Sequence, residues 1–542
     1  MAVDTAYGFH PLVSAWFSGR YGKPTPVQAE AWPAIARGEH ILALAPTGSG
    51  KTLTAFLGAL SRFADGSYPA QGLSVLYLSP LKALNEDVRR NLVEPARELG
   101  AYFAGHGEAF PFVRVATRSG DTSQAERRRM LADPPSILCT TPESLFILLS
   151  SRSGAAMLSS LRLVVVDEIH ALLSSKRGTS LAASLGRLAL LAGEFQRVGL
   201  SATLREPAKA ASFLGGARLL GSVGQKAILT GHGANPAAPP RYEERPVRII
   251  APPADKRYEL AVLWPAAPVN APLPFGGYGG AVYEPDAARS RYTAIVRDLA
   301  PRLARESGVL AFADSRRRAE RLAALMNDEA GEGSAWAHHG SLSKDIRRAV
   351  ELRLKEGRLP CIVATSSLEL GVDLGSIGLV ALAGSPSRAD QALQRLGRAG
   401  HSVGLASRGI LYPFHPMDIL TAAALAGAVA DKDVDGSPVP KAPLDVLAQL
   451  VLSMTLFEER DAGGLYDEIR SFAPYRELIR ADFDSVLSML AGRIRGSRVK
   501  ELKAWLSIDD DTGRVKAREG AAILLYGSGG AINEAFVAGQ VD

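Results

Sequence analysis

Short strand-like runs alternate with helical patterns through most of the chain, and this alternation limits the possible folds more than any other feature. The runs are rich in β-branched residues and end in Gly, Ser, Thr or Pro before the next helical pattern, which favours parallel sheets flanked by helices. One set of runs lies between residues 40 and 203, and a second lies between residues 308 and 414. Pro and Gly are concentrated between residues 223 and 285, as in a linker. The sequence therefore predicts an α/β fold with two parallel-sheet lobes.

A third region follows the second lobe. After residue 430 the alternation stops, and Leu444, Leu447 and Leu450 stand at helical spacing behind Pro443. A chain of 542 residues also exceeds the size at which one hydrophobic core keeps growing. We therefore expect a mainly helical third domain.

Composition narrows the class of protein only modestly. The two cysteines, Cys139 and Cys361, lie inside apolar runs and are expected to be buried free thiols in a reducing compartment. The first residues have no secretory pattern, and no apolar run is long enough to span a bilayer, so we expect a cytoplasmic protein without membrane contact. A net charge of +6 is compatible with a polyanionic partner but does not identify one.

The segment APTGSGKT, residues 45–52, has the pattern of a phosphate-binding loop, with Ala45 in place of the usual first glycine. It follows a strand and precedes a helix, so its amides and the helix N-terminus can face phosphate oxygens, which makes an ordinary glycine turn improbable. Lys51 would neutralise the β- and γ-phosphates of ATP, and Thr52 would bind Mg²⁺. The predicted nucleotide-binding residues of this loop are Thr47, Gly48, Ser49, Gly50, Lys51 and Thr52.

An acidic pair completes this candidate ATP site. Asp167 and Glu168 directly follow the apolar run LVVV, at the strand end where α/β sheets bind ligands. Asp167 would hold Mg²⁺ through water, and Glu168 would position and deprotonate the attacking water. An acidic pair after a strand is often only a helix cap, but together with the glycine loop it indicates ATP hydrolysis.

A second-lobe motif suggests how hydrolysis is controlled. QRLGRAGH, residues 394–401, places Gln394 and Arg398 one helical turn apart. A guanidinium that reaches the γ-phosphate across a cleft stabilises the charge of the transition state. ATP hydrolysis would then depend on closure of the two lobes.

Taken in order, the motifs of the chain resemble those of superfamily 2 helicases. They are PTPVQ, APTGSGKT, SPLKAL, TRSGDT, TTPESL, DEIH, SAT, FADSRRRAE, HHGSLS, ATSSLELGVD and QRLGRAG. The variants DEIH, TSSLELGVDLG, QRLGRAGH and PLDVLAQ are similar to the Lhr, or large helicase-related, group of bacterial and archaeal DNA repair helicases. This resemblance covers nearly the whole chain.

The resemblance assigns further roles. It implies that Gln28 reads the adenine edge, with Tyr21 or Phe17 as possible stacking partners. It also implies that Arg398 is an arginine finger. Where the superfamily commonly has a second arginine, this chain has His401, which serves orientation or coupling or merely caps a turn. Gly371 and Asp373 would face the nucleotide, and His170, Ser201 and Thr203 would couple the phosphate state to strand binding.

Hydroxyl, amide and basic groups recur where strands end, as in proteins that grip a single strand by its phosphates. Any one such hydroxyl is more often a helix cap. Together they predict a nucleic-acid track over both lobes, made of Ser79, Lys82, Arg118, Gly120, Thr141 and Pro142 in the first lobe and of Arg316, Gly340, Ser341, Thr365 and Ser366 in the second.

The resemblance implies two tandem RecA-like lobes followed by a winged-helix domain. We expect the lobes at residues 1–225 and 226–430, the winged helix at 431–508, and the start of a mostly missing further domain at 509–542. The chain would then be a shortened or engineered form of a longer protein, or a short natural variant. The implied activity is ATP-dependent, 3′-to-5′ translocation on single-stranded DNA, with unwinding of DNA duplexes or RNA:DNA hybrids in DNA repair. A Ski2-like RNA helicase and an ATP-switched nucleic-acid-binding scaffold remain alternatives, and the sequence names no protein partner.

Overall fold

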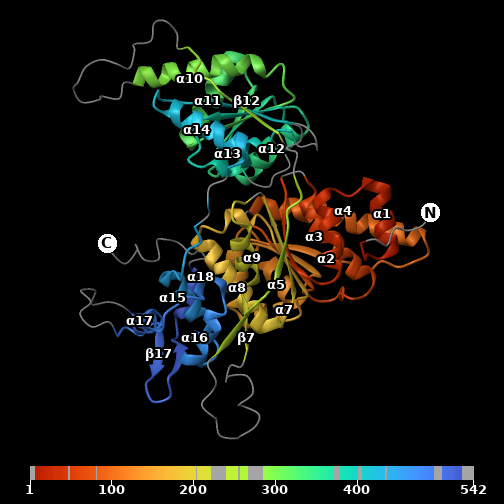
Figure 1. Cartoon of the computed structure of the whole chain (residues 1–542), viewed down its shortest axis with the longest axis vertical. Helices are drawn as coiled ribbons and strands as arrows, with labels where there is room; N and C mark the ends of the chain where they lie inside the picture. Colours follow the sequence, from red (N-terminus) through yellow and green to blue (C-terminus); the bar gives the residue numbers. More distant parts are fainter. Residues whose placement is uncertain are drawn as a thin grey trace. The chain divides into compact units, whose positions relative to one another are not determined.

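The structure is a computed structural model of the whole chain (Figure 1). It describes residues 7–46, 49–80, 82–202, 204–220, 240–253, 257–266, 285–369, 377–400, 406–433, 436, 438–493 and 503–527. The chain divides into two compact units. The first holds residues 1–45, 50–252 and 437–542, and the second holds residues 46–49 and 253–436.

The first lobe is built on a parallel sheet, which within the described residues has seven strands in the order β3-β4-β2-β5-β6-β1-β9. An antiparallel ribbon of β7 and β8 lies beside it. The strands are β1 (His40–Leu44), β2 (Val75–Leu78), β3 (Val115–Arg118), β4 (Ile137–Thr140), β5 (Leu163–Val166), β6 (Gln196–Ser201), β7 (Ala217–Leu220), β8 (Arg241–Glu244) and β9 (Val247–Ile250).

Helices cover both faces of this sheet because its strands are apolar on both sides. Alternate strand residues enter two cores, one with Ile41 and Val165 and the other with Leu42 and Val166. Figure 1 shows α2 and α3 on one side of the strands and α8 and α9 on the other. The helices are α1 (Pro11–Tyr21), α2 (Pro26–Ala36), α3 (Lys51–Ala64), α4 (Lys82–Gly105), α5 (Gln124–Ala132), α6 (Pro142–Leu149), α7 (Arg152–Leu158), η1 (Ile169–Ala171), α8 (Lys176–Ala192) and α9 (Pro207–Gly215).

The second unit repeats this plan. Its parallel sheet has, among the described residues, the order β10-β15-β14-β11-β13-β12. Its elements are β10 (Tyr258–Val262), α10 (Pro285–Leu299), η2 (Ala300–Arg302), β11 (Val309–Ala313), α11 (Arg316–Ala330), β12 (Ala335–His338), α12 (Lys344–Lys355), β13 (Cys361–Ala364), η3 (Ser366–Leu368), β14 (Leu379–Ala383), α13 (Ala389–Leu396), β15 (Ser407–Tyr412) and α14 (Asp418–Asp431). The predicted pair of α/β lobes is confirmed.

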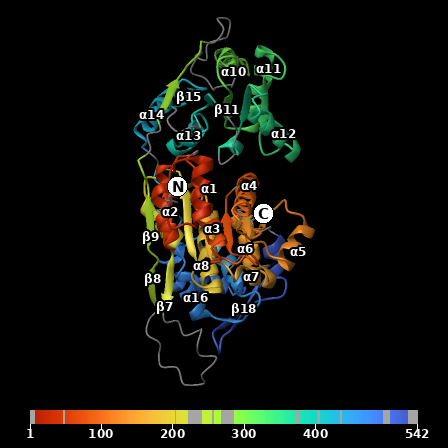
Figure 2. The same cartoon turned by 90° about the vertical axis from the view of Figure 1, so that its right-hand side faces the viewer.

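The third domain combines helices with a small antiparallel sheet of order β16-β18-β17. It belongs to the first unit, and its α16 lies beside the first lobe in both views (Figures 1 and 2). Its core also takes in Phe146 and Ala183 of the first lobe. The elements are α15 (Leu444–Met454), β16 (Arg460–Asp461), α16 (Ala462–Arg470), η4 (Ala473–Tyr475), α17 (Arg480–Leu490), β17 (Leu506–Asp509), β18 (Arg514–Ala517) and α18 (Ala521–Gly527).

Two predicted boundaries differ from the structure. The first lobe continues beyond residue 225, because β9 pairs with β1 at the edge of its sheet. The third domain continues beyond residue 508, because Val515, Ala521 and Leu525 are buried in its core. Residues 509–527 therefore complete this domain instead of starting another.

Two further expectations concern the cysteines and membrane-spanning helices. Cys139 and Cys361 are both buried free thiols, as predicted. Among the described helices, none combines the length and the apolar character that crossing a bilayer requires.

Candidate ATP site and nucleic-acid track

The elements of the candidate ATP site meet at one edge of the first sheet. The phosphate loop follows β1, the acidic pair follows β5, and β6 lies between these two strands. All three strands are parallel, so their carboxyl ends share an edge. The backbone amide of Ala45 donates to the carbonyl of Ser201 at 3.1 Å, which ties the start of the loop to the end of β6.

The described part of the phosphate loop is held by Gln28. Its Nε2 donates to the Gly50 carbonyl at 3.3 Å, and its Oε1 accepts from the Thr25 amide at 3.0 Å. Gly50 has a φ of 80°, and a Cβ there would lie 2.6 Å from Gln28 Nε2, so only glycine suits this position. Gln28 therefore fastens the loop, while its predicted contact with adenine stays a prediction.

Lys51 and Thr52 begin α3, so the helix N-terminus faces the loop. Lys51 Nζ donates to the Ala45 carbonyl at 2.6 Å, and its charge partly offsets the rise in the pKa of Asp167 that burial and the Glu168 carboxylate cause. The Ser49 hydroxyl also donates to a carbonyl of the loop, that of Pro46, at 2.7 Å. The lysine therefore lies near the acidic pair, as a phosphate-binding lysine requires.

Both carboxylate oxygens of Asp167 are engaged. Oδ1 accepts from the Glu168 amide at 2.8 Å, and Oδ2 accepts from the hydroxyl of Tyr77. Burial and the neighbouring Glu168 carboxylate raise the pKa of Asp167 to about 7. Each oxygen keeps a further lone pair, so the carboxylate can still bind a hydrated Mg²⁺.

A second oxygen donor suited to this metal follows the phosphate loop. Thr52 carries its hydroxyl in the first turn of α3, and Mg²⁺ takes most of its ligands from water and phosphates. The described residues hold no cluster of three His, Cys, Asp or Glu side chains that could bind a metal by themselves. The donor set therefore suits a nucleotide-bound Mg²⁺.

Glu168 has a strained backbone. Its φ of 50° and ψ of 44° are left-handed, a conformation that only a few non-glycine residues adopt. The turn brings its Oε2 within 3.4 Å of His170 Nδ1. The same Nδ1 accepts from the Ala202 amide at 3.2 Å and lies 3.1 Å from Ser201 Oγ. His170 therefore contacts both the acidic pair and the end of β6, and its predicted coupling role stays a prediction.

The two aromatic candidates for adenine stacking differ in exposure. Phe17 is 5% exposed and belongs to the core, whereas Tyr21 is 46% exposed. Their rings are 5.3 Å apart. Tyr21 is therefore the more accessible of the two.

The first-lobe track residues sit at the ends of three adjacent strands, β2, β3 and β4. Ser79 and Thr141 are buried, and Thr141 Oγ1 caps α6 by accepting from the Ser144 amide. Arg118 is 7% exposed, and burial lowers its pKa to about 10. Its Nη1 has no hydrogen-bond partner among the described residues. Gly120 is exposed, Pro142 is the first residue of α6, and Lys82 begins α4.

The second-lobe track residues also share an edge. They follow β11, β12 and β13, which are neighbouring parallel strands. The Thr365 amide donates to the His338 carbonyl at 3.1 Å, which joins the ends of β13 and β12. The exposed residues of this group are Arg316, Gly340, Ser341 and Ser366.

The motif that contains Gln394 and Arg398 differs from the expected helical turn. α13 ends at Leu396, so Arg398 lies beyond the helix, and it is 2% exposed. Sequence reasoning also missed Arg395, whose guanidinium contacts Glu369 at 3.0 Å and lies over the ring of Phe312. Because Glu369 belongs to the LELGVD segment, this ion pair ties two motifs of the second lobe together.

Six predicted residues lie outside the part of the chain that the structure describes, and their roles stay predictions. They are Thr47, Gly48, Thr203, Gly371, Asp373 and His401.

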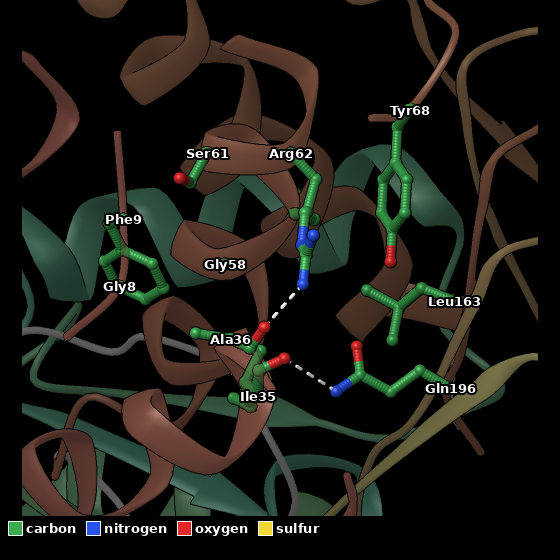
Figure 3. Close-up of a pocket in the computed structure, with 11 residues that line it drawn as sticks. Gly8, Phe9, Ile35, Ala36, Gly58, Ser61, Arg62, Tyr68, Leu163 and Gln196 are labelled. Carbon is green, nitrogen blue, oxygen red and sulfur yellow. Dashed lines mark hydrogen bonds between the residues drawn. The ribbon is translucent and has the colours of Figure 1, made fainter. Parts of the chain in front are cut away.

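A small pocket lies elsewhere in the first lobe (Figure 3). Arg62 Nη2 donates to the Ala36 carbonyl at 2.5 Å, and Gln196 Nε2 donates to the Ile35 carbonyl at 2.9 Å. The pocket has a volume of about 10 Å³, which is enough for a single water molecule. This pocket cannot hold a nucleotide.

Comparison with protein families covers most of the chain. The DEAD/DEAH box helicase family matches residues 25–211, and the helicase conserved C-terminal domain matches residues 291–402. The winged helix domain of large helicase-related proteins matches residues 427–538, beyond the predicted end at 508.

Individual relatives agree with these families. The chain is 40% identical over 97% of its length to an Lhr helicase and probable uracil glycosylase of Mycolicibacterium smegmatis, covering 34% of that protein. It is 38% identical over 95% of its length to an ATP-dependent helicase Lhr-Core protein 2 of Thermococcus barophilus, covering 56% of it. The chain thus spans between a third and somewhat more than half of these relatives.

Solved structures have the same fold. The Mycobacterium smegmatis helicase Lhr bound to ssDNA and AMP-PNP superposes with a TM-score of 0.82 and 39% identity, over 97% of this chain and 63% of that one. The helicase MrfA bound to DNA and AMPPNP gives a TM-score of 0.68 at 20% identity, over 95% of this chain and 62% of that one, which is a likeness of fold alone.

Proposed function

We propose an activity from one premise: the chain belongs to the large helicase-related (Lhr) family of superfamily 2 helicases. On that premise it hydrolyses ATP with Mg²⁺ and uses the energy to move along single-stranded DNA in the 3′-to-5′ direction. This movement along the strand unwinds DNA duplexes or RNA:DNA hybrids during DNA repair. The buried free thiols Cys139 and Cys361 agree with a reducing compartment, and we place the activity in the cytoplasm.

The observation that carries the proposal is the shared sheet edge of the first lobe. The phosphate loop, the acidic pair and the end of β6 meet there, and His170 contacts the last two. We assign phosphate neutralisation to Lys51, the Mg²⁺ site to Thr52 and Asp167, and activation of the attacking water to Glu168. Bound Mg²⁺ would neutralise the developing charge on the phosphates.

In this proposal, each lobe binds the nucleic-acid strand through the neighbouring carboxyl ends of its β-strands. Arg118, at the end of β3, would offer its guanidinium to a phosphate oxygen. The second lobe would contact the sugar-phosphate backbone of the nucleic acid through the exposed residues Arg316, Gly340 and Ser366. If each lobe grips separately, ATP-driven closure and later opening move the strand in one direction.

The test is the ATPase rate of this chain with single-stranded DNA, with single-stranded RNA and with neither. We expect DNA to stimulate hydrolysis and a 3′-tailed duplex to be unwound in preference to a 5′-tailed one. Stimulation by RNA alone would support a Ski2-like RNA helicase. Stable DNA binding without displacement would support an ATP-switched scaffold. A rate that no oligonucleotide changes would refute the proposal.

A further inference from the structure

Tyr77 is a buried side chain that the proposed mechanism does not use, yet it touches the acidic pair. It lies in β2 opposite Val165 of β5, and Asp167 follows two residues further along. Residues two apart on a strand face the same side of a sheet, so Tyr77 and Asp167 share a face. The Tyr77 hydroxyl donates to Asp167 Oδ2.

The ring of Tyr77 is fixed by the phosphate-loop helix. It stacks on Phe56 of α3, with the ring centroids 5.2 Å apart and the planes at 29°. Tyr77 is fully buried and Phe56 is 2% exposed, so neither ring has space to move. Phe56 lies one helical turn after Thr52, on the same side of α3. Tyr77 therefore connects the helix that carries Thr52 to the carboxylate of Asp167.

This contact restricts Asp167 in a specific way. Because the Glu168 amide holds Oδ1 at 2.8 Å and the Tyr77 hydroxyl holds Oδ2, the carboxylate cannot rotate without losing a buried hydrogen bond. Groups that orient a metal ligand in this way commonly change metal affinity by roughly 10- to 100-fold when they are removed.

We propose that Tyr77 is a positioning residue for Mg²⁺ binding: its hydroxyl fixes the orientation of the Asp167 carboxylate, which together with Thr52 would hold the metal. This inference rests on the proposed ATP site. It adds a residue that sequence motifs do not mark, since a tyrosine in a buried strand is typical of a core.

Tyr77→Phe is the decisive variant, because it keeps the stacked ring and removes only the donor. Mn²⁺ replaces Mg²⁺ as the probe, and its binding to the full chain with AMP-PNP is followed by electron paramagnetic resonance. We expect Mn²⁺ affinity to fall by roughly tenfold or more, while AMP-PNP binding in EDTA stays unchanged.

A second tyrosine provides a matched control. Tyr412 in β15 is buried, and its hydroxyl contacts Asp298 Oδ2 at 2.6 Å within the second unit. Tyr412→Phe removes an equivalent hydrogen bond and is expected to leave Mn²⁺ affinity unchanged. In an Asp167→Asn background, Tyr77→Phe should have no further effect on Mn²⁺ binding, because the two residues act through one contact.

Three results would overturn the inference. They are wild-type Mn²⁺ affinity in Tyr77→Phe, an equal loss in Tyr412→Phe, or a parallel loss of AMP-PNP binding in EDTA. Each of these leaves metal-dependent nucleotide binding by the wild-type chain intact. A wild-type chain that binds no AMP-PNP would instead refute the proposed function and this inference with it.

Discussion

Gly186 lies where the third domain packs against the first lobe, and replacing it tests whether these two parts form one packed unit. A Cβ at this position in α8 would lie 2.0 Å from Cδ1 and 2.5 Å from Cε1 of Phe472. Phe472 is 1% exposed, so its ring has no open space to enter. Overpacking of this kind costs about 1 to 3 kcal/mol. Gly186→Ala should therefore strain the contact between α8 and the segment before η4.

The substitution also stabilises the helix, and this gain has to be subtracted from the cost of overpacking. Alanine inside a helix is about 1 kcal/mol more favourable than glycine. Gly100 in α4 is the matched control, because nothing lies within 4 Å of a Cβ built there. The same substitution should thus stabilise the protein by about 0.5 to 1 kcal/mol at Gly100 and destabilise it by up to about 2 kcal/mol at Gly186.

Hydrogen–deuterium exchange on peptides from α8, α15 and η4 measures this difference locally, which suits a chain whose domains need not unfold together. Faster exchange in these peptides is expected for Gly186→Ala alone. Phe472→Leu combined with Gly186→Ala should be less destabilised than the two single changes predict together, because the smaller side chain makes room. If Gly186→Ala is as stabilising as Gly100→Ala, the proposed close packing is wrong.

Further predictions concern the ATP site. Lys51→Ala should abolish ATP hydrolysis, and Glu168→Gln should retain bound ATP and strand binding; joint loss of ATP and strand binding in either variant would indicate misfolding. Arg398→Ala should lower turnover by orders of magnitude with little change in ATP affinity, and unchanged turnover would remove Arg398 from its assigned role. Asp167→Asn should stabilise the nucleotide-free protein more at pH 7 than at pH 4, because burial and the Glu168 carboxylate raise the pKa of Asp167 on folding, and a carboxyl with a raised folded-state pKa makes the protein less stable as pH rises through that window. Unfolding midpoints of both proteins across this range measure the effect, and a constant difference would contradict the buried ionisation.

The two lobes were predictable because their signal is local. A strand buried on both faces is an apolar run, and the helical pattern that follows it identifies a parallel crossover. Such a pattern also places strand-end residues, including Lys51 and Asp167, at one edge of the sheet. The local sequence of a strand does not show in the same way which other strands it pairs with.

The missed features depend on contacts between distant segments. β9 lies in a Pro- and Gly-rich region, so its pairing with β1 is invisible in its own sequence. The small sheet of the third domain is equally hidden, because β16 has only two residues. Tyr77 resembles any core tyrosine until β5 places Asp167 beside it. Arg395 needs Glu369 from another motif before its ion pair can be inferred.

Two features of the ATP site work against the stability of the nucleotide-free protein. Asp167 is buried with a raised pKa, and Glu168 holds a left-handed backbone conformation. A left-handed non-glycine residue alone costs on the order of 1 kcal/mol. Mg²⁺ would compensate the charge of Asp167, and phosphates would give Lys51 an anionic partner. Local strain and a buried carboxyl at one sheet edge are typical of functional sites, and they agree with the proposed binding of a metal–nucleotide complex there.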